Sequence, residues 1–226
     1  MATKTPATTT HSATKLDLFL AKMGAQNTNG RMIFALDATA SRQPTWDQAC
    51  ELQAEMFNEV ATVGGLEIQL VFYRGEQCNA TKWMTDSRQL GETMRRIECI
   101  AGYTQIAKVL AHAHRMHDQS PVAAVVFVGD AMEETLDVLC GRAGELGARG
   151  IRVFMFQEGS DEKVEQAFRQ ITRLTRGAYC RFAPGSAKEL GELLRAAAVF
   201  AAGGTKALEN SKSKEAVKLL EQLKGK

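Results

Sequence analysis

Short apolar runs alternate with amphipathic segments along most of the chain. The apolar runs are rich in Val, Ile, Leu and Phe and are bounded by turn residues, which is typical of buried strands; they cover residues 32–36, 66–75, 122–130, 151–156 and 178–182. Between them, apolar residues recur with the helical period, over residues 45–62, 86–97, 104–117, 132–147, 160–175 and 186–201. The pattern therefore predicts strands that alternate with helices.

This alternation predicts the arrangement of the sheet as well. Strands separated by helices form βαβ units, in which a parallel sheet is covered by helices on both faces. One further strand is predicted at 80–84, and the connection before it is too short for a helical crossover, so we expect it to pair antiparallel at the edge. The predicted fold is a doubly wound, mostly parallel α/β sheet of the Rossmann-like type, in three α/β/α layers, with one short antiparallel edge strand.

We expect four segments along the chain. Residues 1–14 consist largely of Thr and Ala with few large apolar side chains, so they are predicted to be a disordered tail. Residues 15–29 hold a short amphipathic helix and a turn, and residues 30–201 form the α/β domain. Residues 202–226 are predicted to be a polar linker, which begins at Gly203-Gly204, and a closing amphipathic helix.

Composition limits the classes of partner and the compartment. Lys and Arg number 28 against 26 Asp and Glu, a net charge of +2, so we expect neither a nucleic acid nor a membrane as partner. The five cysteines form no Cys-x-x-Cys pair, which favours reduced thiols. The amino terminus has no signal-peptide pattern, and no apolar run approaches the roughly 18 residues that span a bilayer. We therefore expect a cytoplasmic protein.

Oxygen-bearing side chains follow the predicted strands at one edge of the sheet. The first strand ends at Asp37, and two hydroxyl residues, Thr39 and Ser41, follow at alternate positions, so the three side chains can converge. Thr104 stands at the start of a predicted helix, and Asp130 follows the long apolar strand. The carboxyl edge of such a sheet is where ligands bind. Hard oxygen donors suit Mg²⁺ or Mn²⁺ rather than zinc.

These five residues resemble the metal-ion-dependent adhesion site of von Willebrand factor type A domains. The signature of that site is Asp-x-Ser-x-Ser, a distant Thr and a distant Asp. The sequence matches it at Asp37, Ser41, Thr104 and Asp130, with Thr39 in place of the first serine and with Gly-Asp-Ala where the family often has Thr-Asp-Gly. The resemblance covers roughly 30 to 201 and includes the contexts at 102–106 and 174–179.

The resemblance implies a role for each residue. The hydroxyls of Thr39, Ser41 and, in the active state, Thr104 would contact the metal ion, while Asp37 and Asp130 would act largely through bound water. The sixth position of the ion would take an Asp or Glu of a partner protein. We therefore expect an intracellular protein-binding module rather than an enzyme, serving as a scaffold or a regulatory subunit of a larger assembly.

Two other functions stay open. A Mg²⁺-dependent phosphoryl-transfer or phosphate-binding protein also uses aspartates at a sheet edge. However, aspartyl phosphatases would have a second carboxylate at the position of Thr39, and no general base accompanies the motif. The other alternative is a domain that has lost its metal and binds through its helical faces.

Two further clusters of residues are candidates for a binding site. Histidines gather near the end of the helix predicted at 104–117, where they would either bind a transition metal or, as we favour, stabilise the helix terminus; they are His112, His114 and His117. Three glycines lie within a predicted helix and do not follow a strand, so they do not fit a dinucleotide-binding loop; they are Gly141, Gly144 and Gly147.

Overall fold

Five parallel strands and one antiparallel edge strand form a single sheet. The structure is a computed structural model that describes residues 30–39, 47, 65–184 and 186–225. The sheet order is β3-β2-β1-β4-β5-β6, with bounds β1 (Gly30–Asp37), β2 (Leu66–Arg74), β3 (Gln77–Ala80), β4 (Ala124–Gly129), β5 (Arg152–Glu158) and β6 (Ala178–Phe182). Only the pairing of β2 with β3 is antiparallel among these strands. The predicted sheet is confirmed.

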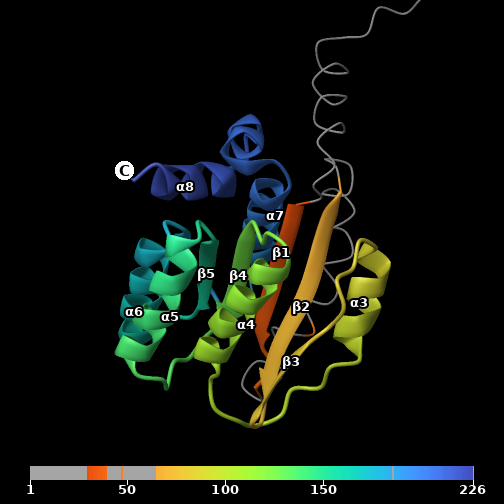
Figure 1. The fold of residues 1–226 in the computed structure, drawn as a ribbon, viewed down its shortest axis with the longest axis vertical. Helices are drawn as coiled ribbons and strands as arrows, with labels where there is room; N and C mark the ends of the chain where they lie inside the picture. Colours follow the sequence, from red (N-terminus) through yellow and green to blue (C-terminus); the bar gives the residue numbers. More distant parts are fainter. Residues whose placement is uncertain (1–29, 40–46, 48–64, 185, 226) are drawn as a thin grey trace, which may run out of the picture.

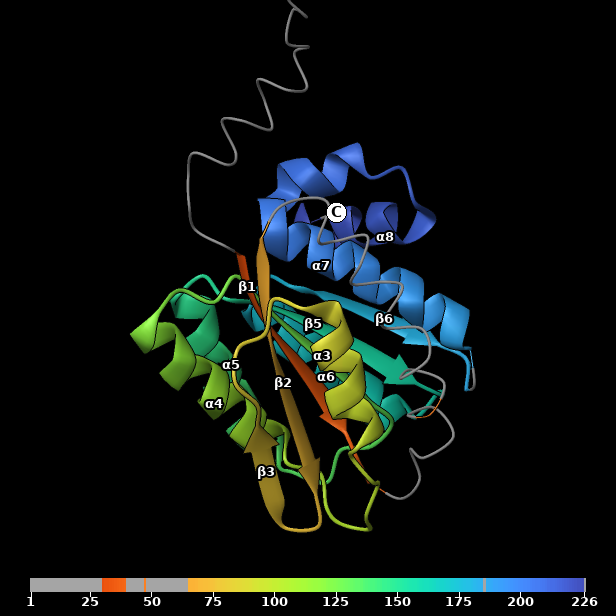
Figure 2. The same cartoon turned by 90° about the vertical axis from the view of Figure 1, so that its right-hand side faces the viewer.

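Helices cover both faces of the sheet (Figures 1 and 2). One face packs against α4 (Ile106–Gln119), α5 (Leu136–Ala148) and α6 (Glu162–Leu174), and the other against α3 (Ser87–Arg95) and α7 (Ala187–Asn210). Alternation along the strands explains the two cores, because successive side chains point to opposite faces. In β1, Phe34 belongs to the core under α3 and α7, whereas Ile33 and Ala35 belong to the core under α4 to α6. The three-layer α/β/α architecture is confirmed.

The antiparallel edge strand lies earlier in the chain than predicted. We expected it at 80–84, but β3 covers Gln77–Ala80 and is joined to β2 by a tight turn. Gly75 makes that turn with a φ of 55°, a left-handed conformation that costs glycine little. Met84 still forms an isolated antiparallel bridge with Ile68.

The last part of the chain is more helical than predicted. We expected a polar linker from Gly203, but α7 continues to Asn210 and changes direction at Gly204, where φ is 67° and ψ is −162°. Leu208 beyond this kink is fully buried, which explains why the helix continues. The closing helix is α8 (Lys214–Leu223), and its Leu219 is buried in the same core.

Some predictions lie outside the described residues. They are the tail at 1–14, the helix and turn at 15–29, Ser41, and the helix at 45–62 except for Asp47. None of the helices within the described ranges combines the length and the apolar character needed to cross a bilayer.

Candidate metal centre

The register of the sheet places Asp37 and Asp130 at adjacent strand ends. In the parallel pairing of β1 with β4, Leu36 lies opposite Val128, so Asp37 comes level with Gly129, and Asp130 follows. A Cβ atom on Gly129 would lie 3.7 Å from the Cβ of Asp37 and 2.7 Å from the ring of Phe127. Glycine at this position therefore lets the two strand ends approach closely.

Hydrogen bonds fix the segment that follows β1. Asp37 is 1% exposed, and its Oδ1 accepts a 2.8 Å hydrogen bond from the backbone N–H of Thr39. This contact makes a local turn that an aspartate favours. The backbone N–H of Ala38 donates to the carbonyl of Tyr73 in β2. The carbonyl of Ala38 accepts from the N–H of Ile100 at 3.0 Å. The loop that carries Thr104 is thereby joined to the loop that carries Asp37 and Thr39.

The Thr104 hydroxyl is held by the loop that follows Asp130. Its Oγ1 donates to Oε2 of Glu134 at 3.2 Å and accepts from the backbone N–H of Glu133 at 3.0 Å. The N–H of Thr104 also donates to the Glu133 carboxylate at 2.6 Å. A hydroxyl has one proton and two lone pairs. One lone pair of the buried Thr104 oxygen therefore remains for a metal ion.

Glu134 also caps the amino terminus of α4. Its carboxylate accepts from the N–H groups of Ile106 at 3.0 Å and Ala107 at 2.7 Å. The first N–H groups of a helix lack partners within the helix, and a carboxylate there also interacts favourably with the helix dipole. Gln105, which precedes α4, donates its side chain to the carbonyl of Gly75 instead. The contacts made by Glu133 and Glu134 also explain why α5 begins at Leu136 and not at residue 132.

Replacing Glu134 with alanine should lower the free energy of unfolding by about 1–3 kcal/mol, because two helical N–H groups and the Thr104 hydroxyl lose their acceptor. Urea denaturation measures this change. Glu145→Ala is the matched control, since Glu145 forms an exposed ion pair with Arg142 at 3.2 Å, which contributes little. Equal stability of the two variants would contradict a capping role for Glu134.

The donors at this edge fit a hard divalent cation. Oδ1 of Asp130 is buried and has no hydrogen-bond partner within the described part of the chain, and a buried anionic oxygen needs a compensating charge or donor. Asp37, Thr39 and Thr104 lie on the neighbouring loops, and carboxylates with hydroxyls suit Mg²⁺ or Mn²⁺. The described residues contain no group of three or more His, Cys, Asp or Glu placed to hold a metal. The proposed set differs from such groups because it consists largely of hydroxyls.

The predicted donors are partly placed by these contacts. Asp37, Thr39, Thr104 and Asp130 lie on three interconnected loops at one edge of the sheet, whereas Ser41 lies outside the described residues. Binding of one ion by all of them stays a prediction.

Two of the three histidines of α4 make structural contacts, whereas the buried Nε2 of His114 has no hydrogen-bond partner among the described residues. Nε2 of His112 lies 2.8 Å from Oε1 of Gln69, and burial lowers the pKa of His112. Nδ1 of His117 accepts from the N–H of Val122 at 3.1 Å, which fixes the chain where it leaves α4. The contacts of His112 and His117 support the structural interpretation for these two residues.

Comparisons with known proteins identify the fold. No family model matches the sequence, and no curated protein matches it. A von Willebrand factor type A protein from Catenulispora acidiphila aligns with a TM-score of 0.63 at 16% identity, covering 78% of this chain and 43% of that chain. The SpRpn10 VWA domain aligns with a TM-score of 0.58 at 9% identity, covering 72% of this chain and 94% of that domain.

A third similar structure has a metal in a motif of its own. Proximal thread matrix protein 1 from the mussel byssus is described with a zinc-occupied metal-ion-dependent adhesion site (MIDAS) motif. It aligns with a TM-score of 0.58 at 13% identity. The match covers 74% of this chain and 45% of the mussel chain, so this chain spans less than half of the mussel protein and of the Catenulispora protein. Together with the sheet order and the antiparallel edge strand, these similarities show that the chain has the fold of a von Willebrand factor type A domain.

Proposed function

We propose that the chain is an intracellular protein-binding module that engages an Asp or Glu of a partner through Mg²⁺ or Mn²⁺ at the carboxyl edge of its sheet. In this role it serves as a scaffold or a regulatory subunit of a larger assembly. The observation that carries the proposal is the buried Oδ1 of Asp130, without a hydrogen-bond partner among the described residues, at the strand end beside Asp37.

Each residue has a defined part in this proposal. Asp37 and Asp130 supply the negative charge that attracts the ion, and the hydroxyls of Thr39, Ser41 and Thr104 contact it. The Thr104 hydroxyl donates its hydrogen bond to Glu134, which leaves an oxygen lone pair of Thr104 for the ion. A divalent ion held in this way would supply an electrophilic position for a partner carboxylate. The zinc-occupied motif of the mussel protein supports divalent-metal binding by this fold.

The surface around the site favours a protein partner. Six large apolar side chains are exposed among the described residues. Four of them flank the site: Ile100 and Tyr103 lie on the loop before Thr104, and Leu136 and Val138 lie in the first turn of α5. Tyr103 is 73% exposed, and tyrosines at the centre of interfaces often contribute strongly to binding. Exposed apolar patches are typical of protein interaction sites.

The phosphate-binding alternative has less support. Glu133 and Glu134 add two carboxylates beside Thr104, and like charges would repel a phosphate group. The nearest lysine on α4, Lys108, donates to Oε1 of Gln105 and to the carbonyl of Glu76. We therefore propose a binding role without catalysis.

Affinity capture from the native host, with and without a chelator, tests the proposed function. Asp37→Ala and Asp130→Ala should each abolish Mg²⁺-dependent capture and leave the circular dichroism spectrum unchanged. Asp118→Ala is the control, because Asp118 makes an exposed ion pair with Arg149 at the far end of α4. Capture that survives both chelation and these substitutions would contradict the proposal.

The same capture assay tests the apolar surface. Tyr103→Ser should reduce Mg²⁺-dependent capture by about tenfold, the effect of losing one strong interface contact, without changing metal affinity. Val217→Ser is the matched control, because Val217 is an exposed apolar residue of α8 and lies away from the site. Equal losses in both variants would assign no special role to Tyr103.

A further inference from the structure

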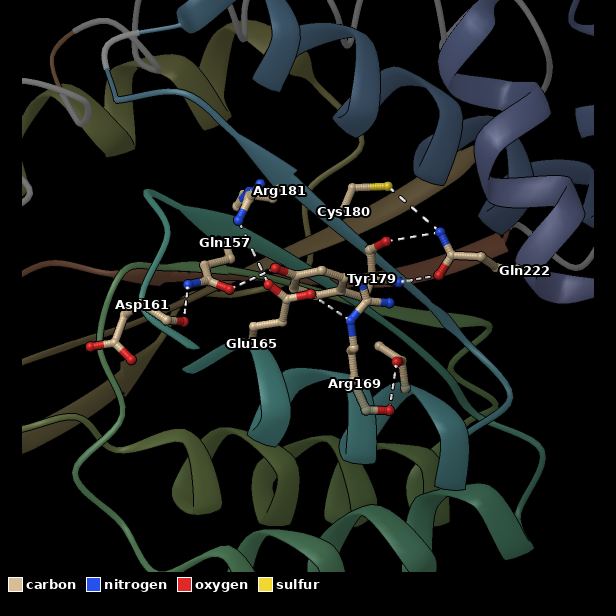
Figure 3. Close-up of polar contacts among 9 residues, drawn as sticks. Gln157, Asp161, Glu165, Arg169, Tyr179, Cys180, Arg181 and Gln222 are labelled. Atoms are coloured by element: carbon tan, nitrogen blue, oxygen red, sulfur yellow. Dashed lines mark hydrogen bonds and ion pairs between the residues drawn. The ribbon is translucent and has the colours of Figure 1, made fainter. Parts of the chain in front are cut away.

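The outer edge of β6 is paired with a side chain of α8. The amide of Gln222 accepts from the backbone N–H of Tyr179 at 2.8 Å and donates to the carbonyl of Tyr179, also at 2.8 Å (Figure 3). A primary amide carries the same donor and acceptor as a peptide group. Gln222 therefore makes at Tyr179 the two hydrogen bonds that a neighbouring strand would make. These contacts show that the N–H and C=O of Tyr179 both face away from β5.

The next outward-facing peptide groups of β6 belong to Arg181. Backbone groups of successive residues in a strand point to opposite sides, so Arg181 faces the same way as Tyr179. Phe182, which follows it, points its carbonyl toward the β5 side and accepts there from the N–H of Gly159. The outward groups of Arg181 lie about 6.7 Å further along the strand than those of Tyr179, beyond the amide of Gln222. They are placed to continue the pairing that Gln222 begins.

A cavity of about 410 Å³ lies beside this edge, between α6, β6 and α8. Its volume falls within the range of about 300–1,000 Å³ typical of binding pockets. The lining holds three cationic and two anionic side chains; the full set is Glu165, Arg169, Tyr179, Cys180, Arg181, Lys218, Glu221 and Gln222.

The lining of this cavity holds one more cationic than anionic side chain, and its Lys218 also lies 4.0 Å from Glu215. Glu165 is shared by two arginines, with Oε1 2.7 Å from Nε of Arg169 and Oε2 3.7 Å from Arg181 (Figure 3). Arg169 also stacks on the ring of Tyr179, with 4.4 Å from the guanidinium carbon to the ring centroid. One carboxylate cannot neutralise two guanidinium groups. Arg181, whose side chain is 52% exposed, therefore retains attraction for a further anionic group.

We propose that the outer edge of β6 at Arg181, with the adjoining cavity, binds an extended peptide segment of a partner protein that carries an acidic side chain. The peptide backbone pairs with the outward N–H and C=O of Arg181, as in strand addition to a sheet edge. Its carboxylate meets the guanidinium of Arg181. This surface lies two strands away from β4 and its Asp130, so the inference is independent of the metal site.

Fluorescence anisotropy with the full chain tests this docking surface. The probes are labelled peptides of sequence Val-Thr-Glu-Thr-Val, the same peptide with Lys at the centre, and the Glu peptide with N-methyl groups on the peptide nitrogens of one edge. The Glu peptide should bind, and the other two should bind about tenfold more weakly or less, because one lacks the acidic group and the other cannot pair.

Variants and amide exchange locate the binding. Arg181→Glu should weaken binding of the Glu peptide by about tenfold or more, whereas Arg173→Glu, an exposed change on α6 outside the cavity lining, should not. Bound peptide should slow hydrogen exchange at the Arg181 amide, while the Tyr179 amide, already bonded to Gln222, changes little.

Three outcomes would overturn the inference. They are the absence of binding by the Glu peptide, equal binding of the N-methylated peptide, and unchanged exchange at Arg181 with peptide bound. Self-association of the protein that Arg181→Glu abolishes, without peptide binding, would assign the edge to a second copy of the chain.

Discussion

Replacing Asp130 with asparagine should weaken Mn²⁺ binding by about 10–100-fold, the usual effect of removing a residue that acts on a metal through its outer shell. Asparagine keeps the shape of the side chain and removes its negative charge. The same change should raise stability in the presence of a chelator, because it removes one of two neighbouring negative charges at the ends of β1 and β4. Titration calorimetry with Mn²⁺ and urea denaturation in EDTA measure the two effects.

The two effects have opposite signs, and this separates a metal-directed carboxylate from a structural one. If Asp130 had a purely structural role, its replacement would lower the stability of the protein in EDTA and would leave the affinity for Mn²⁺ unchanged. Asp118→Asn serves as control, since its side chain is 53% exposed and pairs with Arg149 at 3.2 Å. Wild-type Mn²⁺ affinity in Asp130→Asn would remove the main support for the proposed site.

Gly147→Ala should lower the free energy of unfolding by about 1–3 kcal/mol or more, because it overpacks the contact between α5 and α6. A Cβ atom at this position would lie 2.1 Å from the carbonyl oxygen of Leu174 and 3.4 Å from the Cα of Thr175. Both atoms belong to the backbone, so neither can rotate away, and the helices must separate. Urea denaturation measures the loss.

Gly144→Ala provides a matched control on the same helix. Apart from the adjacent backbone of α5, no described atom lies within 4 Å of a Cβ placed on Gly144, so alanine there should stabilise the protein by about 0.5–1 kcal/mol through its higher helix propensity. Similar effects of the two substitutions would mean that α5 and α6 do not approach each other at Gly147. A larger effect at Gly147 than at Gly144 would give Gly147 a role in helix packing. The glycines of this helix do not form a phosphate-binding loop.

Local patterns in the sequence were enough to predict the parallel sheet and to place Asp37 and Asp130 at its carboxyl edge. The apolar runs that end at Asp37 and Asp130 mark strand ends, and the parallel topology then places both residues at one edge. These inferences depend only on the alternation of side chains and on the geometry of βαβ units.

Contacts between distant segments could not be predicted in this way. Glu134 caps a helix that begins 28 residues earlier in the chain, and a glutamate in a polar loop gives no local sign of its partner. A signal was present in the start of α4, which lacks a Ser, Thr, Asp or Asn immediately before Ile106. The continuation of α7 past Gly204 depends likewise on the burial of Leu208, which is a property of the folded chain.

The shared carboxylate of Glu134 makes α4 a natural reporter of the metal site. One carboxylate accepts hydrogen bonds from the Thr104 hydroxyl and from the N–H groups of Ile106 and Ala107. A shift of Thr104 toward a bound ion must therefore change the hydrogen bonding of these two amides. Their NMR chemical shifts would register occupation of the site directly, without knowledge of the partner.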